Sequence, residues 1–512
     1  MLIGEILSDA AAHAPEKTAI RMGGFEQSFA ALDRAANRVG NALVRAGYGK
    51  GRNVAILSPN RPEYAAIHFG AARSGAVLAH LSTRAPDGEI ARILAATDIE
   101  ALFVDASLAG APVGLRDDAP ELERIVVIGG AAPGGMERYE DFLSGASDEP
   151  PPVAVAPDDP CVITFTGGTT GLPKGVVASQ EARAIGSVRA RREFELEDDD
   201  VFCCSTPLFH IAGLLVWFQT GVLNRNTQVL MPAWDAEEFM RLVEEEGVTA
   251  AFLVPTQINA VIGHPRFSAD RLKGWRYCNF GGAPMPNALA ERMMEALPHL
   301  EWVEQYGQSE TGNLTVRPPR FARSKMGSAG RAFSDVDLAI LDDRDRPLPP
   351  GEIGELVTRG AHRMIGYYND PDATAETVTA DGWVRTGDIG YLDGDGFLFL
   401  VDRSKDMIVS GGENIYPTEI EDALCRHPAV NECAVFGIPD ERWGEVPAAH
   451  VVLQADAGTE EEELIAFVAG RVARHKRPRR IRFVDAMPKT PVGKIQKNLI
   501  RAPYWEGRER VI

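Results

Sequence analysis

A stretch near residue 170 combines residue types that could bind phosphate. Residues 166–175 read TGGTTGLPKG, in which glycines let backbone amides approach phosphate oxygens while threonine hydroxyls and a lysine add further donors. The stretch is not a Walker A motif, because Lys174 follows a proline and no serine or threonine follows the lysine. By composition alone it is also compatible with a surface turn.

Two further stretches place a carboxylate beside groups that could bind a nucleotide. In YGQSET (306–311), Ser309 and Glu310 are adjacent, and a hydroxyl next to a carboxylate suits a phosphate and a hard cation such as Mg²⁺. WVRTGD (383–388) ends in Asp388, and one carboxylate can accept hydrogen bonds from both hydroxyls of a ribose. Taken singly, each carboxylate is more often a solvated loop or turn residue.

Two more stretches follow toward the end of the chain. The fourth combines DRSKD (402–406) with SGGENIYP (410–417), and the fifth is PKTPVGKI (488–495). A single lysine close to a chain end normally faces solvent, so Lys494 in the fifth stretch indicates little by itself. The order of all five stretches is more informative than any one of them.

In this order, the five stretches resemble the motifs of the adenylate-forming enzyme superfamily, in its acyl-CoA synthetase and aryl-CoA ligase branch. The resemblance covers essentially the whole chain and includes GGAP (281–284) and GEIGEL (351–356). It departs at Gly167, where the family usually has a serine. Because the backbone donors remain, we expect an altered affinity for ATP without loss of function, which a kinetic comparison with Gly167→Ser would test.

The resemblance implies an AMP-forming acyl-CoA synthetase. Such an enzyme attaches the AMP of ATP to a carboxylic acid, releases pyrophosphate, and then lets the thiol of coenzyme A displace AMP. Catalytic roles are implied for Lys494, Glu310 and Arg403, and a Mg²⁺ site for Glu310 and Thr169. The implied ATP-binding residues are Thr166, Gly167, Gly168, Thr169, Thr170, Gly171, Lys174, Gly281, Gly282, Ala283, Tyr306, Gly307, Ser309, Asp388, Arg403 and Lys494.

The resemblance also implies that a C-terminal domain rotates about Lys405 between the two half-reactions. The rotation would exchange Lys494 for the stretch that begins at Gly411. A basic run at 471–482 would suit the phosphates of coenzyme A, although a basic helix end that complements the helix dipole also explains it. The implied coenzyme A-binding residues are Gly411, Gly412, Glu413, Asn414, Trp443, Lys476 and Arg477.

The implied acid-binding pocket is apolar. It would be lined by Phe209, His210, Gly213, Trp217, Phe280, Gln308 and Leu314. Such a lining favours a hydrophobic acid, and no acidic residue follows Phe209 to pair with the ammonium of an amino acid. A fatty acid and an aromatic acid both remain. Three other functions stay open: an enzyme that loads an acyl group onto a carrier protein, a light-emitting oxygenase, and an inactive nucleotide-binding sensor.

The pattern of apolar residues indicates the elements that must position these motifs. Strand-like apolar runs at 54–58 and 76–81 flank a helical pattern at 62–74, and Asp235 can cap a further helix. Such alternation predicts an α/β fold in which helices cover mostly parallel sheets. We expect an N-terminal domain at 1–401 with a β-rich subdomain at about 320–400, and a mobile α+β domain at 402–512 with its hinge near 402–405.

Composition narrows the class of protein. The chain has 512 residues, of which 45% are hydrophobic and 25% charged, as in an ordinary globular protein of more than one domain. Its net charge of −20 argues against a nucleic-acid partner. The N-terminus lacks a basic signal-peptide region and no apolar run is long enough to span a membrane, so we expect a cytoplasmic enzyme. The sequence does not determine the oligomeric state and leaves a homodimer open. The six cysteines show no metal or redox spacing, and Cys203–Cys204 is expected in a buried strand.

Overall fold

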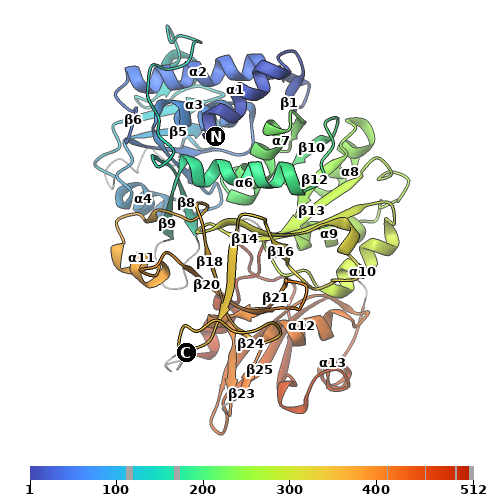
Figure 1. The fold of residues 1–512 in the computed structure, drawn as a ribbon. Coiled ribbons are helices and arrows are strands. Elements are labelled where there is room, and N and C mark those ends of the chain that lie inside the picture. Colours follow the sequence, from blue (N-terminus) through green and yellow to red (C-terminus); the bar gives the residue numbers. More distant parts are fainter. Residues whose placement is uncertain (111–118, 167–172, 412, 456, 491–492, 507–512) are drawn as a thin grey trace.

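Two large sheets form the N-terminal lobe of the chain, and a smaller sheet forms the C-terminal lobe, which Figure 1 shows in orange and red. The structure, a computed structural model, describes residues 1–110, 119–166, 173–411, 413–455, 457–490 and 493–506. The predicted fold class, a large α/β domain followed by a small α+β domain, is confirmed. Within these ranges, no helix combines the length and the apolar composition needed to cross a membrane.

The eight-stranded sheet joins a parallel core to an antiparallel edge. In spatial order its strands are β19 (Gly366–Tyr367), β9 (Lys174–Ser179), β8 (Pro160–Thr166), β4 (Val77–Leu81), β3 (Asn53–Leu57), β5 (Ala101–Asp105), β6 (Arg124–Ile128) and β7 (Glu137–Arg138). From β8 to β7 the strands pair in parallel, whereas β9 pairs antiparallel with both β8 and β19. Strands β3 and β4, both predicted from their apolar runs, are buried along their whole length.

The thirteen-stranded sheet changes from parallel to antiparallel along its width. In spatial order its strands are β17 (Asp337–Leu341), β18 (Gly354–Arg359), β20 (Val384–Leu392), β21 (Phe397–Arg403), β16 (Gly330–Ala332), β15 (Gly312–Arg317), β14 (Glu301–Gln308), β13 (Tyr277–Gly281), β12 (Ala250–Leu253), β10 (Val201–Cys204), β11 (Thr227–Leu230), β1 (Thr18–Met22) and β2 (Phe25–Ser28). The strands from β1 to β14 pair in parallel, and those from β14 to β17 pair antiparallel. The β-rich region expected after residue 320 therefore extends this sheet.

Helices fill the space between the two sheets and cover their other faces. The largest apolar cluster joins both sheets, for example through Ile56 of β3 and Phe252 of β12. The helical segments that contribute to this cluster are α1 (Ile3–His13), α2 (Phe29–Arg45), α3 (Pro62–Ser74), α5 (Tyr139–Phe142), α6 (Gln180–Glu193), the π-helical η3 (Ala212–Phe218) and α7 (Gln219–Leu223). Further helices of this lobe are α4 (Asp87–Ala96), α8 (Ala236–Glu245), α9 (Pro255–Ile262), α10 (Asn287–Ala296) and α11 (Pro371–Thr377).

Local sequence signals match the observed element ends. Asp235 accepts a hydrogen bond from the backbone N–H of Glu238 at 2.8 Å, so it caps α8 as predicted. Helix α3 ends at Gly75, whose φ of 74° is a conformation that favours glycine. Cys203 and Cys204 lie in β10 and are buried, as predicted.

The C-terminal lobe has an apolar core of its own. Its strands are β22 (Ile408–Ser410), β23 (Glu413–Ile415), β24 (Val430–Asp440), β25 (Gly444–Leu453) and β26 (Arg480–Phe483), and its helices are α12 (Pro417–Cys425), α13 (Glu461–Ala469) and α14 (Lys497–Arg501). The main core of this lobe joins Ile420 of α12, Val435 of β24 and Leu464 of α13, and takes no residue from the N-terminal lobe. A separate core is what a domain needs to move as a unit.

The two lobes contact each other through α10 and α12. Pro286, which precedes α10, provides no capping side chain. Asp422 of α12 accepts a hydrogen bond from the backbone N–H of Asn287 at 3.1 Å and so caps α10 from the other lobe. Arg426 of α12 lies 3.5 Å from the carboxylate of Glu291 on α10. These contacts favour one orientation of the lobes.

Trp217 is part of the core between the two sheets. Its ring stacks on Phe202 with 4.2 Å between ring centroids and on Tyr277 with 6.3 Å, and its indole N–H donates to the carbonyl of Cys203 at 2.9 Å. Leu314 is fully buried in the same cluster. The sequence predicts both side chains at the acid-binding pocket, and the structure places both in this buried cluster.

Replacing Trp217 by alanine should lower the free energy of unfolding of the N-terminal lobe by roughly 3–5 kcal/mol, because a large buried ring is lost and a cavity remains. Trp217→Phe keeps an aromatic ring and should cost clearly less. Urea denaturation followed by circular dichroism measures both changes. A loss of less than roughly 1 kcal/mol for the alanine variant would contradict the core position of this ring.

Candidate active site

Asp388 is the centre of a hydrogen-bonded group formed by β14, β20 and β21. It is 5% exposed, and its Oδ2 accepts hydrogen bonds from the Tyr306 hydroxyl at 2.6 Å and from the side-chain amide of Gln308 at 2.7 Å. Arg403, its register partner on β21, places Nε 3.3 Å from Oδ1. Burial and the Asp388 carboxylate raise the pKa of Tyr306, so its hydroxyl keeps its proton. Gly307 lies between the two donors on β14.

The phosphate-loop candidate and the Ser309–Glu310 pair meet at Tyr367. The Tyr367 hydroxyl donates to Oε1 of Glu310 at 2.9 Å, and Nζ of Lys174 lies 4.8 Å from the centre of the same ring. This meeting follows from the pairing of β19 with β9. Thr166, the last residue of β8, is the register partner of Lys174. Gly167, Gly168, Thr169, Thr170 and Gly171 lie outside the described residues.

The predicted adenine-binding segment, 281–283, follows β13 and runs close to other backbone. A Cβ atom on Gly281 would lie 2.4 Å from the backbone oxygen of Gln305, a distance that excludes any side chain. The Cβ position of Gly282 lies 3.9 Å from Cε of Lys494. The small residues of this segment therefore leave room for the lysine from the other lobe.

Lys494 is carried to this group by a hairpin of the C-terminal lobe in which residues 488–490 pair antiparallel with 493–496. Backbone hydrogen bonds of 2.7 and 2.8 Å join the two segments. Burial, and then the charge of Arg403, lowers the pKa of Lys494 to about 8, while Asp388 and Glu310 oppose this shift. Both lobes therefore contribute charged groups to a single site.

His210 and Phe209 belong to the N-terminal lobe, and His210 lies close enough to Lys494 of the C-terminal lobe to be affected by its charge. Burial, and then the charge of Lys494, lowers the pKa of His210 to about 3, so its ring is neutral at physiological pH. Nδ1 of His210 accepts a hydrogen bond from the backbone N–H of Ala212 at 3.3 Å. Phe209 is almost fully buried. Of the other predicted pocket residues, Gly213 and Phe280 are buried.

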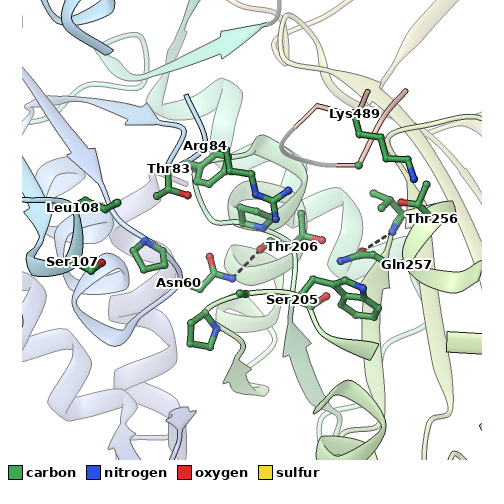
Figure 2. Close-up of a pocket in the computed structure, with 18 residues that line it drawn as sticks. Asn60, Thr83, Arg84, Ser107, Leu108, Ser205, Thr206, Thr256, Gln257 and Lys489 are labelled. Carbon is green, nitrogen blue, oxygen red and sulfur yellow. Dashed lines mark hydrogen bonds between the residues drawn. The ribbon is translucent and has the colours of Figure 1, made fainter. Parts of the chain in front are cut away.

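A cavity of about 510 Å³ lies between the two lobes and has Phe209 in its wall. Figure 2 shows Asn60, Thr83 and Arg84 on one side of the cavity and Thr256, Gln257 and Lys489 on the other. All residues labelled in Figure 2 except Leu108 carry polar side chains. The lining also includes apolar side chains such as Phe209, Trp234 and Val254, so the cavity offers both polar and apolar surface to a ligand.

Comparison with known protein families shows to which family the chain belongs. The family described as AMP-binding enzyme matches residues 7–368, and the AMP-binding enzyme C-terminal domain matches residues 419–494. The chain belongs to the AMP-binding enzyme family. The two matches fall on the two lobes, and the resemblance inferred from the five sequence stretches is confirmed.

Relatives of this AMP-binding enzyme are acid–thiol ligases. It is 37% identical to feruloyl-CoA synthase of Amycolatopsis sp over 491 residues, which is 96% of each chain. It is 36% identical to the fatty acid–acyl-carrier-protein ligase ScoC of Streptomyces coeruleorubidus, over 98% of this chain and 96% of the relative. The solved structure of the anthranilate CoA ligase AuaEII in complex with anthranoyl-AMP has a TM-score of 0.93 at 27% identity, and the match covers 99% of this chain and 98% of that one. The predicted activity, an AMP-forming acyl-CoA synthetase, is confirmed.

The stretch that begins at Gly411, predicted to replace Lys494 in the second half-reaction, lies away from the site in this AMP-binding enzyme. Strand β23, which carries Glu413 and Asn414, is drawn in Figure 1 at the end of the C-terminal lobe that is remote from the N-terminal lobe. Trp443 is 39% exposed, and its ring lies 2.6 Å from the Cβ position of Gly411, so the two pack together. The structure therefore brings Lys494 to the site in this orientation and leaves the β23 stretch outside it.

Lys476, Arg477 and Lys405 complete the predicted residues of the C-terminal lobe. Lys476 forms an ion pair with Glu419 at 2.5 Å. Nε of Arg477 is buried and has no hydrogen-bond partner among the described residues. Lys405 lies in the turn between β21 and β22, where burial lowers its pKa. Gly412 lies outside the described part of the chain.

Three residues of the site region have no signal in the sequence. Tyr367 joins Lys174 to Glu310, Arg84 lines the cavity, and Arg183 donates from Nη2 to the carbonyl of Ser309 at 2.6 Å. None of the three belongs to the five stretches. A single tyrosine or arginine has no distinctive spacing, so only the packing of β19, α6 and the loop between β4 and α4 around the site reveals them.

The pKa of Lys494 near 8 predicts an alkaline limb in the pH dependence of the enzyme. The charged lysine is present below that pKa, so kcat/KM for ATP should fall as the pH rises through about 8. Lys494→Arg should be slower but should lack this limb, because a guanidinium stays charged. Pyrophosphate release between roughly pH 6 and 9.5 measures both profiles. The same limb in both enzymes would show that another group titrates.

Proposed function

We propose that this enzyme activates a compact aromatic carboxylic acid and transfers its acyl group to coenzyme A. One observation carries the proposal: Lys494 of the C-terminal lobe joins Asp388, Glu310 and Arg403 of the N-terminal lobe at a single site. Positive groups and carboxylates gathered there suit a reaction in which the substrates supply both nucleophile and leaving group.

In the first half-reaction, a carboxylate oxygen of the acid attacks the α-phosphorus of ATP, and the bond from that phosphorus to the pyrophosphate oxygen breaks. The protein holds the substrates in line and offsets the negative charge that develops between them. Lys494 would supply positive charge where carboxylate and phosphate meet, and Arg403 would supply more from β21. Asp388, already oriented by Tyr306 and Gln308, would accept the ribose hydroxyls.

We propose that Mg²⁺ binds at Glu310. Oε1 of this carboxylate accepts from Tyr367, and Oε2 accepts no hydrogen bond from the described residues. No group of three or more His, Cys, Asp or Glu that could hold a metal is found among those residues. Phosphate oxygens and water would therefore complete the coordination, as is usual for Mg²⁺ at nucleotide sites. When bound, the ion neutralises phosphate charge.

For the second half-reaction, we assign the cavity beside Phe209 to the pantetheine arm of coenzyme A. Its polar lining residues suit the amides of that arm, its apolar ones suit the methylene groups, and Arg84 and Lys489 offer positive charge to phosphates. The thiol sulfur would attack the acyl carbon of the adenylate, and the bond to the AMP oxygen would break. The separate core of the C-terminal lobe supports a rotation about Lys405 between the two steps.

The packed core favours an aromatic acid over a long-chain fatty acid. A long chain would need a tunnel beyond the site, and Trp217, Phe202 and Tyr277 fill the adjoining core with stacked rings. Feruloyl-CoA synthase and anthranilate CoA ligase are named for aromatic acids, whereas ScoC is named for fatty acids. A compact planar acid needs no displacement of the core rings.

Loading of a carrier protein is the second candidate. Exposed arginines follow one segment of the C-terminal lobe, in an otherwise acidic chain, and would attract an acidic partner. These are Arg471, Arg474, Arg479, Arg480 and Arg482. ScoC is named for an acyl carrier protein. Turnover with free coenzyme A separates the candidates, since a loading enzyme would depend on the carrier instead.

A panel of acids tests the proposed substrate class. With ATP, Mg²⁺ and coenzyme A, cinnamate- and benzoate-type acids should give a kcat/KM at least roughly tenfold above that of hexadecanoate, because the stacked core leaves no room for a long chain. Pyrophosphate release and acyl-CoA formation are measured in parallel. Higher activity with hexadecanoate than with every aromatic acid would reject the aromatic class.

Lys494→Ala separates the two half-reactions. Adenylate formation should slow by about 10²-fold or more, because a charge that acts on the transition state is lost. Thioester formation from a supplied acyl adenylate should change little, since the rotated C-terminal lobe no longer presents this lysine. Single-turnover assays of each step measure the two rates. Equal losses in both steps would show that Lys494 does not act in the first step alone.

A further inference from the structure

A buried arginine without an ion-pair partner lies behind the nucleotide site. Arg183 of α6 is 2% exposed, and its Nη2 donates to the carbonyl oxygen of Ser309 at 2.6 Å. Its Nε and Nη1 have no hydrogen-bond partner in the described part of the chain, and no carboxylate there forms an ion pair with it. Burying an unpaired charge is costly, so a folded protein rarely keeps one without a use.

The titratable groups packed near Arg183 do not neutralise it. Burial raises the pKa of the Cys161 thiol to about 12 and lowers the pKa of His68 to about 4. Burial also lowers the pKa of His80, with added repulsion from His68 and Arg183, and lowers the pKa of His362 to about 3. All four groups are therefore uncharged near pH 7. The guanidinium keeps its charge, because its own lowered pKa is still about 10.

The guanidinium lies directly against the turn that carries Glu310. Nη1 of Arg183 is 3.8 Å from the Cβ position of Gly312, and Nη2 holds the carbonyl that precedes Glu310. Glu310 is the carboxylate with which Arg183 interacts favourably, although the two do not form a close ion pair. The Glu310 side chain points instead to the hydroxyl of Tyr367. The unpaired charge is thus buried directly behind the turn that carries Ser309 and Glu310.

We infer that Arg183 is a positioning residue for the phosphates of ATP, a role that rests on the proposed function. Its hydrogen bond to Ser309 fixes the direction in which Glu310 leaves the turn. Its charge lacks a partner in the protein because the triphosphate provides one when ATP binds. The structure thereby extends the nucleotide site to a residue of α6 that lies outside all five sequence stretches.

Arg189 on the same helix provides a matched control. It is also buried, but its Nε pairs with Asp335 at 2.8 Å, so its charge is already satisfied within the protein. Removing Arg189 should break a structural ion pair, whereas removing Arg183 should relieve an unpaired charge. The two substitutions should therefore have opposite effects on stability.

The test measures nucleotide binding and stability together. Arg183→Met should raise KM for ATP and Kd for inorganic pyrophosphate roughly tenfold or more, leave KM for the acid within about twofold, and keep or raise Tm. Arg183→Gln, which retains a donor for Ser309 without the charge, should behave like the methionine variant. Arg183→Lys should recover most of the affinity. Arg189→Met should lower Tm and leave KM for ATP within about twofold.

Calorimetry with pyrophosphate and Mg²⁺ in the absence of acid reports on Arg183 without any turnover. A wild type that binds pyrophosphate but turns over no acid would contradict the proposed function and leave the role of Arg183 testable by the same titration. Unchanged ATP and pyrophosphate affinities in Arg183→Met, together with a lower Tm, would make Arg183 a structural residue. Wild-type affinities in Arg183→Gln would overturn the role of its charge.

Discussion

Lys494 and Arg403 repel each other in one cleft, and Asp388 and Glu310 must offset that repulsion before any substrate binds. Burial and a second cation lower the pKa of Lys494 to about 8, so the lysine is still mostly charged at physiological pH but loses its proton only slightly above it. ATP and a carboxylate bring further negative charge and would strengthen the charged form. Anionic substrates would thus complement the charges that the protein gathers in this cleft.

The fold brings the carboxylates and the cations of this cleft together by means of strands that are remote in sequence and adjacent in space. Strands β14, β20 and β21 bring Tyr306, Asp388 and Arg403 together, and the pairing of β19 with β9 places Tyr367 between Lys174 and Glu310. The C-terminal lobe contributes through one hairpin. Because Asp422 caps α10 from that lobe, the orientation that delivers the hairpin also completes a helix of the partner lobe.

The interior of the N-terminal lobe serves two purposes. Its stacked rings around Trp217 fill the core between the two sheets, and the proposed preference for a compact acid rests on this packing. Beside this apolar region, helix α6 carries two buried arginines that differ in one respect, since Arg189 has a carboxylate partner and Arg183 has none. That difference is the basis for the proposed role of Arg183 behind the nucleotide site.

The sequence by itself determined the family, the order of the motifs and the glycine and carboxylate positions that define nucleotide chemistry. It also determined elements whose signals are local, such as the cap at Asp235 and the buried strand at Cys203–Cys204. Only the tertiary structure decided that Trp217 belongs to the core, that Gln308 orients Asp388, and that Tyr367, Arg84 and Arg183 adjoin the site. The physical reason is that a motif depends on neighbours in the chain, whereas burial, charge pairing and cavity walls depend on residues that meet only after the sheets pack.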